Sequence, residues 1–371
     1  MSVNRSAVVL RCTSDKQVNR AAATEREHQS GWIDIVNPTE YEGWDDLLLA
    51  SEDCTFFHTA AWAKVLSETY NYKPVYFTVT DADKLIAMVP MMEINSRLTG
   101  RRGISLPFTD YCEPLVANGF DIQNMTDFIK EYGSKRRWKC IEARGGTYPG
   151  VTSTSFYVHT LDINASEDQI FSRFKSNTRR NITKAIRDGV QVRTSRSIEA
   201  VKEYYRLHCI TRKRHGLPPQ PYSFFEKIHE HIISKDTGRV VLASYDKENI
   251  AGSVFFDFNG KSLYKFGASD YAYQRFRPAD LVMWEGIKWS IQNEYHSFCF
   301  GRTAMGNTGL RQFKTRWGTD ERIVEYYKFD FKQDAFVKEP FLVKDSHNRL
   351  FRKMPIPVLK AIGSMLYRHI G

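Results

Sequence analysis

The sequence lacks the cysteine and histidine patterns that build metal centres. Its six cysteines, at positions 12, 54, 112, 140, 209 and 299, form no Cys-x-x-Cys pair and have no zinc-ligand spacing. No His-Glu-x-x-His stretch occurs, and the neighbours His229 and His231 have no further ligand cluster beside them. Scattered single cysteines are typical of reduced thiols in a cytoplasm. We therefore expect a cytoplasmic protein with no metal and no tightly bound cofactor.

Long apolar runs are also missing. Stretches such as Ala87 to Met92 are short and interrupted by proline, whereas a membrane-spanning helix needs about 20 apolar residues. Among the first thirty residues only Ala7 to Leu10 is apolar, which is shorter than the ~7–15-residue core of a signal peptide. We expect no spanning helix and no secretory signal, and we interpret residues 1–30 as a polar, poorly ordered tail.

What is present is a long, basic chain. Its 371 residues are enough for two domains. Lysine and arginine outnumber aspartate and glutamate by 53 to 43, which gives a formal net charge of +10. Such a charge attracts phosphorylated cofactors, nucleic acid or acidic lipid surfaces, although solubility alone accounts for it equally well.

A cluster of turn residues, Gly145, Gly146, Pro149 and Gly150, divides the chain near residue 150. We expect domains at 31–150 and 151–335, followed by a tail at 336–371. Apolar periodicity predicts the elements of the first domain. They are helices at 39–50, 59–69 and 121–136 and strands at 74–80, 85–94 and 139–143.

The second domain carries a longer pattern. Its expected strands are 155–163, 239–245, 250–258, 262–268, 297–300 and 323–331, and its expected helices are 166–189, 197–213, 223–234, one from Pro278, and 308–316. Asn259-Gly260 predicts a hairpin turn. This order resembles that of the N-acetyltransferase (GNAT) fold, and the hairpin around Asp81 resembles the one around Asp246. The expected fold class is α+β, with two tandem GNAT-like domains, each a mostly antiparallel twisted sheet flanked by helices.

Residues 166–189 combine helical and basic character. Ser166 and Gln169 form a capping-box start, and Gly189 suits the end, with a break at Asn177 as an option. No acidic residue occurs from Ile170 to Arg187. The cations there are Arg173, Lys175, Arg179, Arg180, Lys184 and Arg187. They form either an anion-binding stripe or an ordinary solvated face.

The loop before Pro278 is a weak match to a phosphate-binding loop at a helix start. Gln274 and Ala279 fit the pattern, whereas Arg277 replaces a glycine and would have to bind phosphate through its guanidinium. Asp280 at the helix start disfavours a neighbouring anion. We expect Gln274, Arg275, Arg277 and Ala279 to contact the phosphates of an acyl-CoA co-substrate.

Several motifs resemble the FemAB-type family of peptidoglycan-bridge aminoacyltransferases and their acyltransferase relatives. In the second domain they are Phe174-Lys175, residues 178–182, Leu207-His208, Thr211-Arg212, residues 215–218, Phe224-Phe225, residues 266–269, Pro278, Trp284, residues 300–303, Gly309, Phe313-Lys314 and Trp317-Gly318. In the first they are residues 57–59, Trp62, Lys64, residues 105–108, Asp110-Tyr111 and Pro114-Leu115. The likeness spans residues 32–330. Cys299 departs from it, because many relatives have an acid at that place.

The resemblance implies an enzyme that transfers an acyl group to an amine. Such chemistry needs a deprotonated amine and a stabilised oxyanion, and direct attack is the simplest mechanism. Asp110 and His208 are candidate bases, with a turn-forming and a helix-packing role as their alternatives. Lys314 is the third catalytic candidate. Substrate contacts are expected from Lys64, Arg179, Arg180, Arg212, Arg302 and Phe313, and the arginines are equally compatible with surface or ion-pair roles.

Three functions remain open. The first is transfer from acyl-CoA to an amine on an envelope or exopolysaccharide precursor, and a lipid-linked saccharide is one such acceptor. The second is an aminoacyl-tRNA-dependent peptidoglycan-precursor aminoacyltransferase; the absence of a heptad pattern for a coiled-coil arm argues mildly against it. The third is a non-catalytic basic module that binds nucleic acid or membrane. We expect no stable nucleic-acid partner.

The tail, residues 336–371, is basic and amphipathic. It is expected either to lie on an anionic membrane, peripherally at the inner face, or to dock on the body of the protein.

Overall fold

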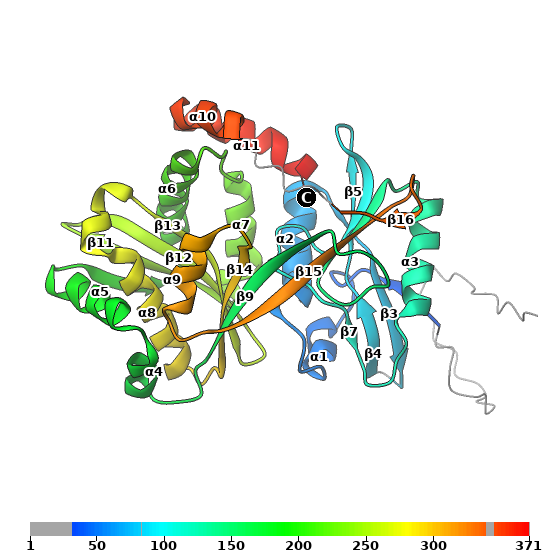
Figure 1. Ribbon diagram of the computed structural model, residues 1–371, viewed down its shortest axis with the longest axis horizontal. Coiled ribbons are helices and arrows are strands. Elements are labelled where there is room, and N and C mark those ends of the chain that lie inside the picture. The colour runs from blue at the N-terminus through cyan, green and yellow to red at the C-terminus, as the bar shows by residue number, and fades with distance from the viewer. Residues whose placement is uncertain (1–31, 83, 339–344, 371) are drawn as a thin grey trace, which may run out of the picture.

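One twelve-stranded sheet runs through both halves of the chain (Figure 1). The computed structural model describes residues 32–82, 84–338 and 345–370, so the expected tail at 1–30 lies outside the described residues. In spatial order the strands are β10 (Gln191–Ser195), β11 (Gly238–Tyr245), β12 (Glu248–Phe258), β13 (Lys261–Ser269), β14 (Ser297–Ala304), β9 (Thr154–Asp162), β15 (Asp320–Asp330), β8 (Cys140–Arg144), β6 (Gly100–Ile104), β5 (Met92–Ser96) and β2 (Lys73–Pro74). A short strand, β16 (Ala335–Phe336), pairs with β15.

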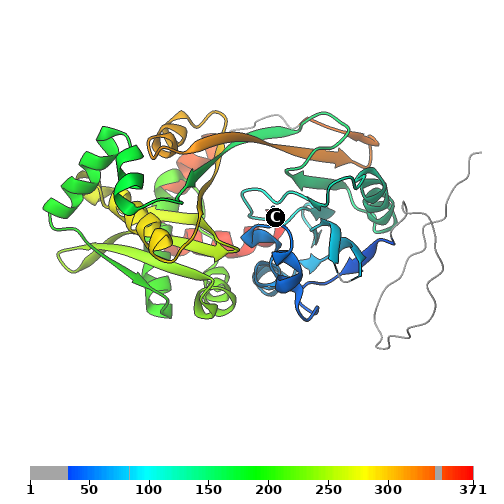
Figure 2. The same ribbon diagram turned by 90° about the horizontal axis from the view of Figure 1, so that it is seen from below.

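Strand β15 joins the two halves. Its first part, Asp320 to Tyr326, pairs antiparallel with β9. Its last part, Tyr326 to Asp330, pairs antiparallel with β8 of the first half. Both views show β15 as a long strand crossing from one half to the other (Figures 1 and 2). Although a boundary near residue 150 was expected, residues 326–330 therefore build part of the first half as well.

The first half has a second, four-stranded sheet. Its strands, in order, are β1 (Asp34–Val36), β3 (Tyr76–Asp81), β4 (Lys84–Val89) and β7 (Leu115–Val116). The expected single strand at 85–94 is two strands, because Pro90 lacks an N–H to donate within a sheet. The chain changes sheets there, from β4 to β5. The helices of this half are α1 (Trp44–Leu49), α2 (Ala60–Tyr70) and α3 (Gln123–Lys135).

Helices cover both faces of the second-half sheet. They are α4 (Glu167–Arg173), α5 (Ser176–Arg187), α6 (Ile198–His215), α7 (Tyr222–His231), α8 (Pro278–Gln292) and α9 (Thr308–Thr315). Alternate residues of β11 enter different cores: Val240 packs in the core that includes α6, and Val241 packs in the core that includes α8. Since side chains alternate across a strand, α6 and α8 lie on opposite faces.

The basic segment forms two helices, and the break precedes the expected one at Asn177. The capping box of Ser166 and Gln169 is confirmed at the start of α4. The chain turns at Phe174, whose ring packs edge-on against Trp317 at 4.9 Å. The next residue, Lys175, donates its backbone N–H to the carbonyl of Arg316. These contacts with residues 316 and 317 therefore determine where α4 ends and α5 begins. Strand β10 was not expected, because its sequence is polar and largely exposed.

The C-terminal segment forms α10 (Asp345–Lys353) and α11 (Ile356–Ile370). Helix α11 contacts α6 of the second half and β5 of the first half. Its inner face buries Leu359, Gly363 and Tyr367. Docking on the body, one of the two expected outcomes, is therefore what the structure shows for this face.

Candidate active site

The candidate site lies where β13 and β14 separate. These parallel strands pair only from Lys261 with Ser297 to Leu263 with Cys299. Beyond that point a loop of the first half, residues 105–112, reaches the separated strands. The loop is closed by Ser105, whose hydroxyl donates to the carbonyl of Cys112 at 3.0 Å. This arrangement carries Asp110 into the second half.

Two β-bulges aim the strands at Asp110. Lys265 is an extra residue on β13, because the register with β12 shifts between Val254 and Phe255. On β14, Phe300 and Gly301 stand opposite a single residue of β9. A bulge re-aims side chains and bends its strand. Gly301 has φ 67°, and a Cβ there would meet the Asp110 carboxylate at 3.1 Å. Glycine thus allows both the backbone conformation and the close approach.

Asp110 is held from several sides. Lys265 Nζ lies 2.9 Å from Asp110 Oδ2 and also donates to the carbonyl of Phe108 at 2.6 Å. The backbone N–H of Arg302 donates to Asp110 Oδ1 at 3.3 Å. The Tyr326 hydroxyl donates to the Asp110 carbonyl at 2.7 Å and accepts from the Arg302 guanidinium at 2.6 Å. Residues of β13 and β14 therefore hold the Asp110 carboxylate, and a residue of β15 holds its backbone carbonyl.

Lys314 completes the cluster from α9. Its Nζ donates to the carbonyls of Gly301 and Arg302, each at 2.8 Å, and the residue is 2% exposed. These two bonds hold the bulge of β14 in place. We call Asp110, Lys265, Arg302, Lys314 and Tyr326 the interdomain cluster.

The interdomain cluster has a surplus of positive charge. Burial acts to raise the pKa of Asp110, but Lys265, Arg302 and Lys314 outweigh it and hold that pKa below its usual value. Burial lowers the pKa of Lys314 to about 8, although Asp110 and Cys299 oppose the shift. Three basic side chains thus surround one ionised carboxylate. Such a site stabilises an anion that forms or binds beside it.

The sequence offered Asp110, Arg302 and Lys314 as separate candidates, and the structure brings them together. Lys265 and Tyr326 were missed. The available signal for Lys265 was a single basic residue within an otherwise apolar strand. The Asp110 carboxylate also lies beside the backbone of Gly301 on β14. This position is two residues after Cys299, which departs from the family pattern. Burial raises the pKa of the Cys299 thiol, so this residue stays uncharged.

His208 lies elsewhere, in an aromatic core. Its Nε2 is 2.9 Å from the Gln220 side-chain oxygen, and its ring lies 5.0 Å from that of Phe225. Burial lowers its pKa to about 3, with Arg212 adding to the shift. A neutral, buried and hydrogen-bonded imidazole fits the helix-packing alternative.

Three expected substrate contacts take up other positions. Arg212 donates to the carbonyl of Pro218 and to the Tyr367 hydroxyl, and so helps to dock α11. Lys64 lies on α2 near Asp45. Burial raises the pKa of Asp45, and the charge of Lys64 opposes that shift. Phe313 packs against Trp317 beside the interdomain cluster's Lys314.

The expected phosphate loop is occupied by the protein's own charges. Asp280, buried in the first turn of α8, is bonded by the Arg316 guanidinium and accepts from Asn181. Gln274, Arg275, Arg277 and Ala279 are all exposed around it. Arg277 has φ 57° and caps the helix. A phosphate at this helix start would meet the Asp280 carboxylate.

A basic hollow lies along α5 and includes none of the residues of the expected phosphate loop. It is lined by Ser176, Arg179, Arg180, Thr183, Lys184 and Arg187. Asp188 pairs with Lys184 and Arg187. Among the described residues, Arg179 and Arg180 have no ion-pair partner.

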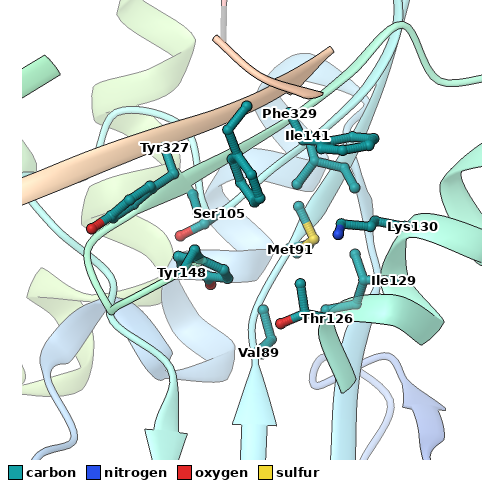
Figure 3. A pocket seen from close by; sticks show the side chains of 12 residues that line it. Val89, Met91, Ser105, Thr126, Ile129, Lys130, Ile141, Tyr148, Tyr327 and Phe329 are labelled. Carbon is teal, nitrogen blue, oxygen red and sulfur yellow. The ribbon is translucent and has the colours of Figure 1, made fainter. Parts of the chain in front are cut away.

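A separate hollow lies in the first half, between α3 and the sheet (Figure 3). It is mostly apolar, and Lys130 lies over the rings of Phe329 and Phe336 at its rim. None of its lining residues belongs to the interdomain cluster. We assign it no role in the chemistry.

Comparison with known proteins supplies the class. Residues 172–315 match the model of the acetyltransferase (GNAT) domain family. The chain is 23% identical over 278 residues to the UDP-N-acetylmuramoylpentapeptide-lysine N(6)-alanyltransferase of Weissella viridescens, covering 73% of this chain and 77% of that protein. The fold is similar to the crystal structure of FemX, with a TM-score of 0.62 at 14% identity over 78% of this chain and 95% of that one. It is also similar to a tandem GNAT protein of the clavulanic acid pathway, with a TM-score of 0.52 at 10% identity over 80% and 98% of the two chains.

The fold and the matched domain define an N-acyltransferase of the GNAT class. Its separated strands, the helices that cover both sheet faces and the tandem halves agree with the expected fold class. Within that class, the chain is similar to the FemAB-like proteins.

Proposed function

We propose that this enzyme transfers an aminoacyl group from aminoacyl-tRNA to an amine of a peptidoglycan precursor. The sequence alone favours acyl-CoA as donor. The observation that favours aminoacyl-tRNA over acyl-CoA as the donor is the Asp280–Arg316 ion pair at the start of α8. The positively polarised helix end is already complemented by a carboxylate, so a cofactor pyrophosphate gains little there.

The basic hollow along α5 supports a larger anionic donor. Arg179 and Arg180 lie there without acidic partners. They follow closely after Phe174, where the chain turns between α4 and α5. Side chains of this kind bind the phosphates of a nucleic acid irrespective of its sequence. The donor would be held along its backbone, with its reactive end directed to the separated strands.

The interdomain cluster supports the chemistry of the transfer. The acceptor amine attacks the ester carbonyl of the donor, a C–N bond forms, and the tetrahedral oxyanion collapses with release of the donor's ribose hydroxyl. The ester C–O bond breaks in this collapse, and the proton lost by the amine goes to the departing ribose oxygen, which thereby becomes the hydroxyl. Lys265, Lys314 and Arg302 stabilise the oxyanion, as preorganised donors do in acyl transfer. Asp110, ionised at neutral pH, orients the incoming amine by accepting its hydrogen bond.

The acceptor class is proposed from the Weissella viridescens relative, whose name specifies the lysine of a UDP-N-acetylmuramoyl pentapeptide. Such a precursor carries carboxylate and diphosphate groups. A site with surplus positive charge suits it.

The test offers both donors to the full chain. The enzyme is incubated with UDP-N-acetylmuramoyl pentapeptide and either mixed aminoacyl-tRNA or acetyl-CoA, and the product is identified by mass spectrometry. We expect an aminoacylated product with tRNA and none with acetyl-CoA. Acetylated product would overturn the proposal in favour of acyl-CoA. Retention on tRNA without turnover by any donor would favour a non-catalytic binding role.

A further inference from the structure

Helix α11 is fixed to the body by one face. Gly363 lies so close to the Pro219 carbonyl that a Cβ there would overlap the carbonyl oxygen. Tyr367 donates its hydroxyl to the Pro218 carbonyl at 3.1 Å, and its own carbonyl accepts from Tyr72 at 2.9 Å. Arg102 of β6 donates to the carbonyls of the helix end. The orientation of the helix is therefore set, and its opposite face must look outward (Figure 1).

That outward face is apolar. Val358 is 46% exposed and Met365 is 69% exposed, and with Ala361 between them they follow the spacing of one helix stripe. Leu350, on the adjoining α10, is 55% exposed. Scattered exposed apolar residues are ordinary, but a stripe on a helix that is already docked by its other face is not needed for folding.

Basic residues flank the stripe. No acidic residue occurs in the sequence from 348 to 370. The exposed cations of this stretch are Arg349, Arg352, Lys353, Lys360 and Arg368. Lys360, however, lies on the docked side of α11, with its Nζ over the Tyr205 ring of α6 at 4.9 Å. We name the apolar stripe and the other four cations together the C-terminal face.

We propose that the C-terminal face binds the surface of an anionic lipid bilayer. An apolar stripe between cations is the pattern of helices that lie in the membrane interface. Within the described residues, no helix is both long and apolar enough to cross a bilayer, so the contact would be peripheral. The proposal stands on this face alone and does not rest on the identity of the donor or acceptor.

Charge argues against the other occupants. A second copy of the chain, packed symmetrically on this face, would bring the same cations against one another. A nucleic acid would engage the cations but would leave Val358 and Met365 exposed to water. Only an anionic surface with an apolar interior satisfies both components.

The test is flotation of the full chain with vesicles. Vesicles of phosphatidylcholine with ~30% phosphatidylglycerol are compared with pure phosphatidylcholine at about 100 mM salt, where a Debye length of about 10 Å leaves surface attraction intact. We expect binding to the anionic vesicles only. The pair Val358→Ser with Met365→Ser should lower the partition coefficient by about tenfold, and Arg352→Gln with Arg368→Gln by a similar factor.

Matched controls keep the result interpretable. Leu49→Ser removes a side chain of α1 that is 51% exposed, and Lys202→Gln removes an exposed cation of α6; neither should change flotation. Circular dichroism and melting temperature establish that the variants fold. Equal binding to both vesicle types, no binding of the wild type, or unchanged binding of the Val358/Met365 pair would each overturn the proposal. So would a dimer in light scattering that the same pair dissociates.

Discussion

Lys265 Nζ lies 2.9 Å from Asp110 Oδ2, although 155 positions separate the two residues in the sequence. Their ion pair links a loop of the first half to a bulge of the second. The side chains are 5% and 15% exposed, so water screens the pair little. The site therefore exists only when both halves are folded and in contact.

Removing one partner of this pair should be costly. Asp110→Asn leaves a buried ammonium without its counter-charge, and we expect a loss of about 3–5 kcal/mol in the free energy of unfolding. Adding Lys265→Met should recover most of that stability in urea titrations. Turnover should stay at least ~100-fold low in both variants, since the charges that act on the reaction are gone. A double variant with near-normal turnover would remove the pair from the chemistry.

Lys314 predicts opposite trends of activity and stability with pH. Its pKa is about 8 in the folded protein, below the ordinary value of a lysine. The folded state therefore releases this proton first, and the contribution of Lys314 to stability rises between about pH 8 and 10. The ammonium that stabilises the oxyanion is lost over the same range, so kcat should fall about tenfold per pH unit above pH 8. Lys314→Arg keeps its charge over this range and should abolish that fall in kcat. If kcat of this variant fell above pH 8 as in the wild type, the assignment of the fall to Lys314 would be wrong.

Arg179 and Arg180 should act on donor binding alone. We expect Arg179→Gln with Arg180→Gln to weaken tRNA binding at low salt and to reduce the slope of log K against log salt by about 1–2, because two phosphate contacts are lost. The value of kcat at saturating donor should not change. Arg193→Gln with Lys202→Gln, at exposed positions on β10 and α6, is the matched control. Equal effects of the two pairs would show a nonspecific charge effect only.

His208 should matter for stability and not for turnover. His208→Leu leaves the Gln220 side chain without its buried partner, and we expect a cost of about 1–3 kcal/mol in unfolding free energy. Measured well below the melting temperature, kcat should remain within about twofold. A folded variant with a loss of about 100-fold would restore His208 as a candidate base.

Gly363→Ala should undock α11. The added methyl would overlap the Pro219 carbonyl oxygen, which backbone atoms cannot accommodate without movement. Hydrogen exchange of the amides from 356 to 370 should become faster by at least about tenfold, while exchange in β11 and β12 stays unchanged. Ser364→Ala, at the adjacent exposed position, is the control.

Local signals predicted much of this fold. Ser166 and Gln169 specify the start of α4, and Pro278 specifies the start of α8, because capping and the fixed φ of proline act within a few residues. Strands β12 and β13 meet at Asn259-Gly260 as expected. The switch of sheets at Pro90 was not predicted, since the apolar run from Ala87 to Met92 continues through it and the sequence does not show which strands each part pairs with.

The site was harder to predict than the fold. Asp110, Arg302 and Lys314 came from family resemblance, whereas Lys265 required knowledge of a register shift that only the paired strands reveal. His208 illustrates the reverse error. Its residue type suits a base, but aromatic side chains of its own helix and of α7 enclose it, and burial lowers its pKa to about 3. Long-range burial decides such cases, and a single sequence does not display it.

The path of β15 has a consequence for how the molecule can be divided. A fragment that ends at residue 150 lacks the strand that hydrogen-bonds to β8, and a fragment that begins there exposes the last residues of β15 as an unpaired edge. Neither piece closes its own sheet. The two fragments expressed together should reassociate through that strand, whereas each alone should aggregate.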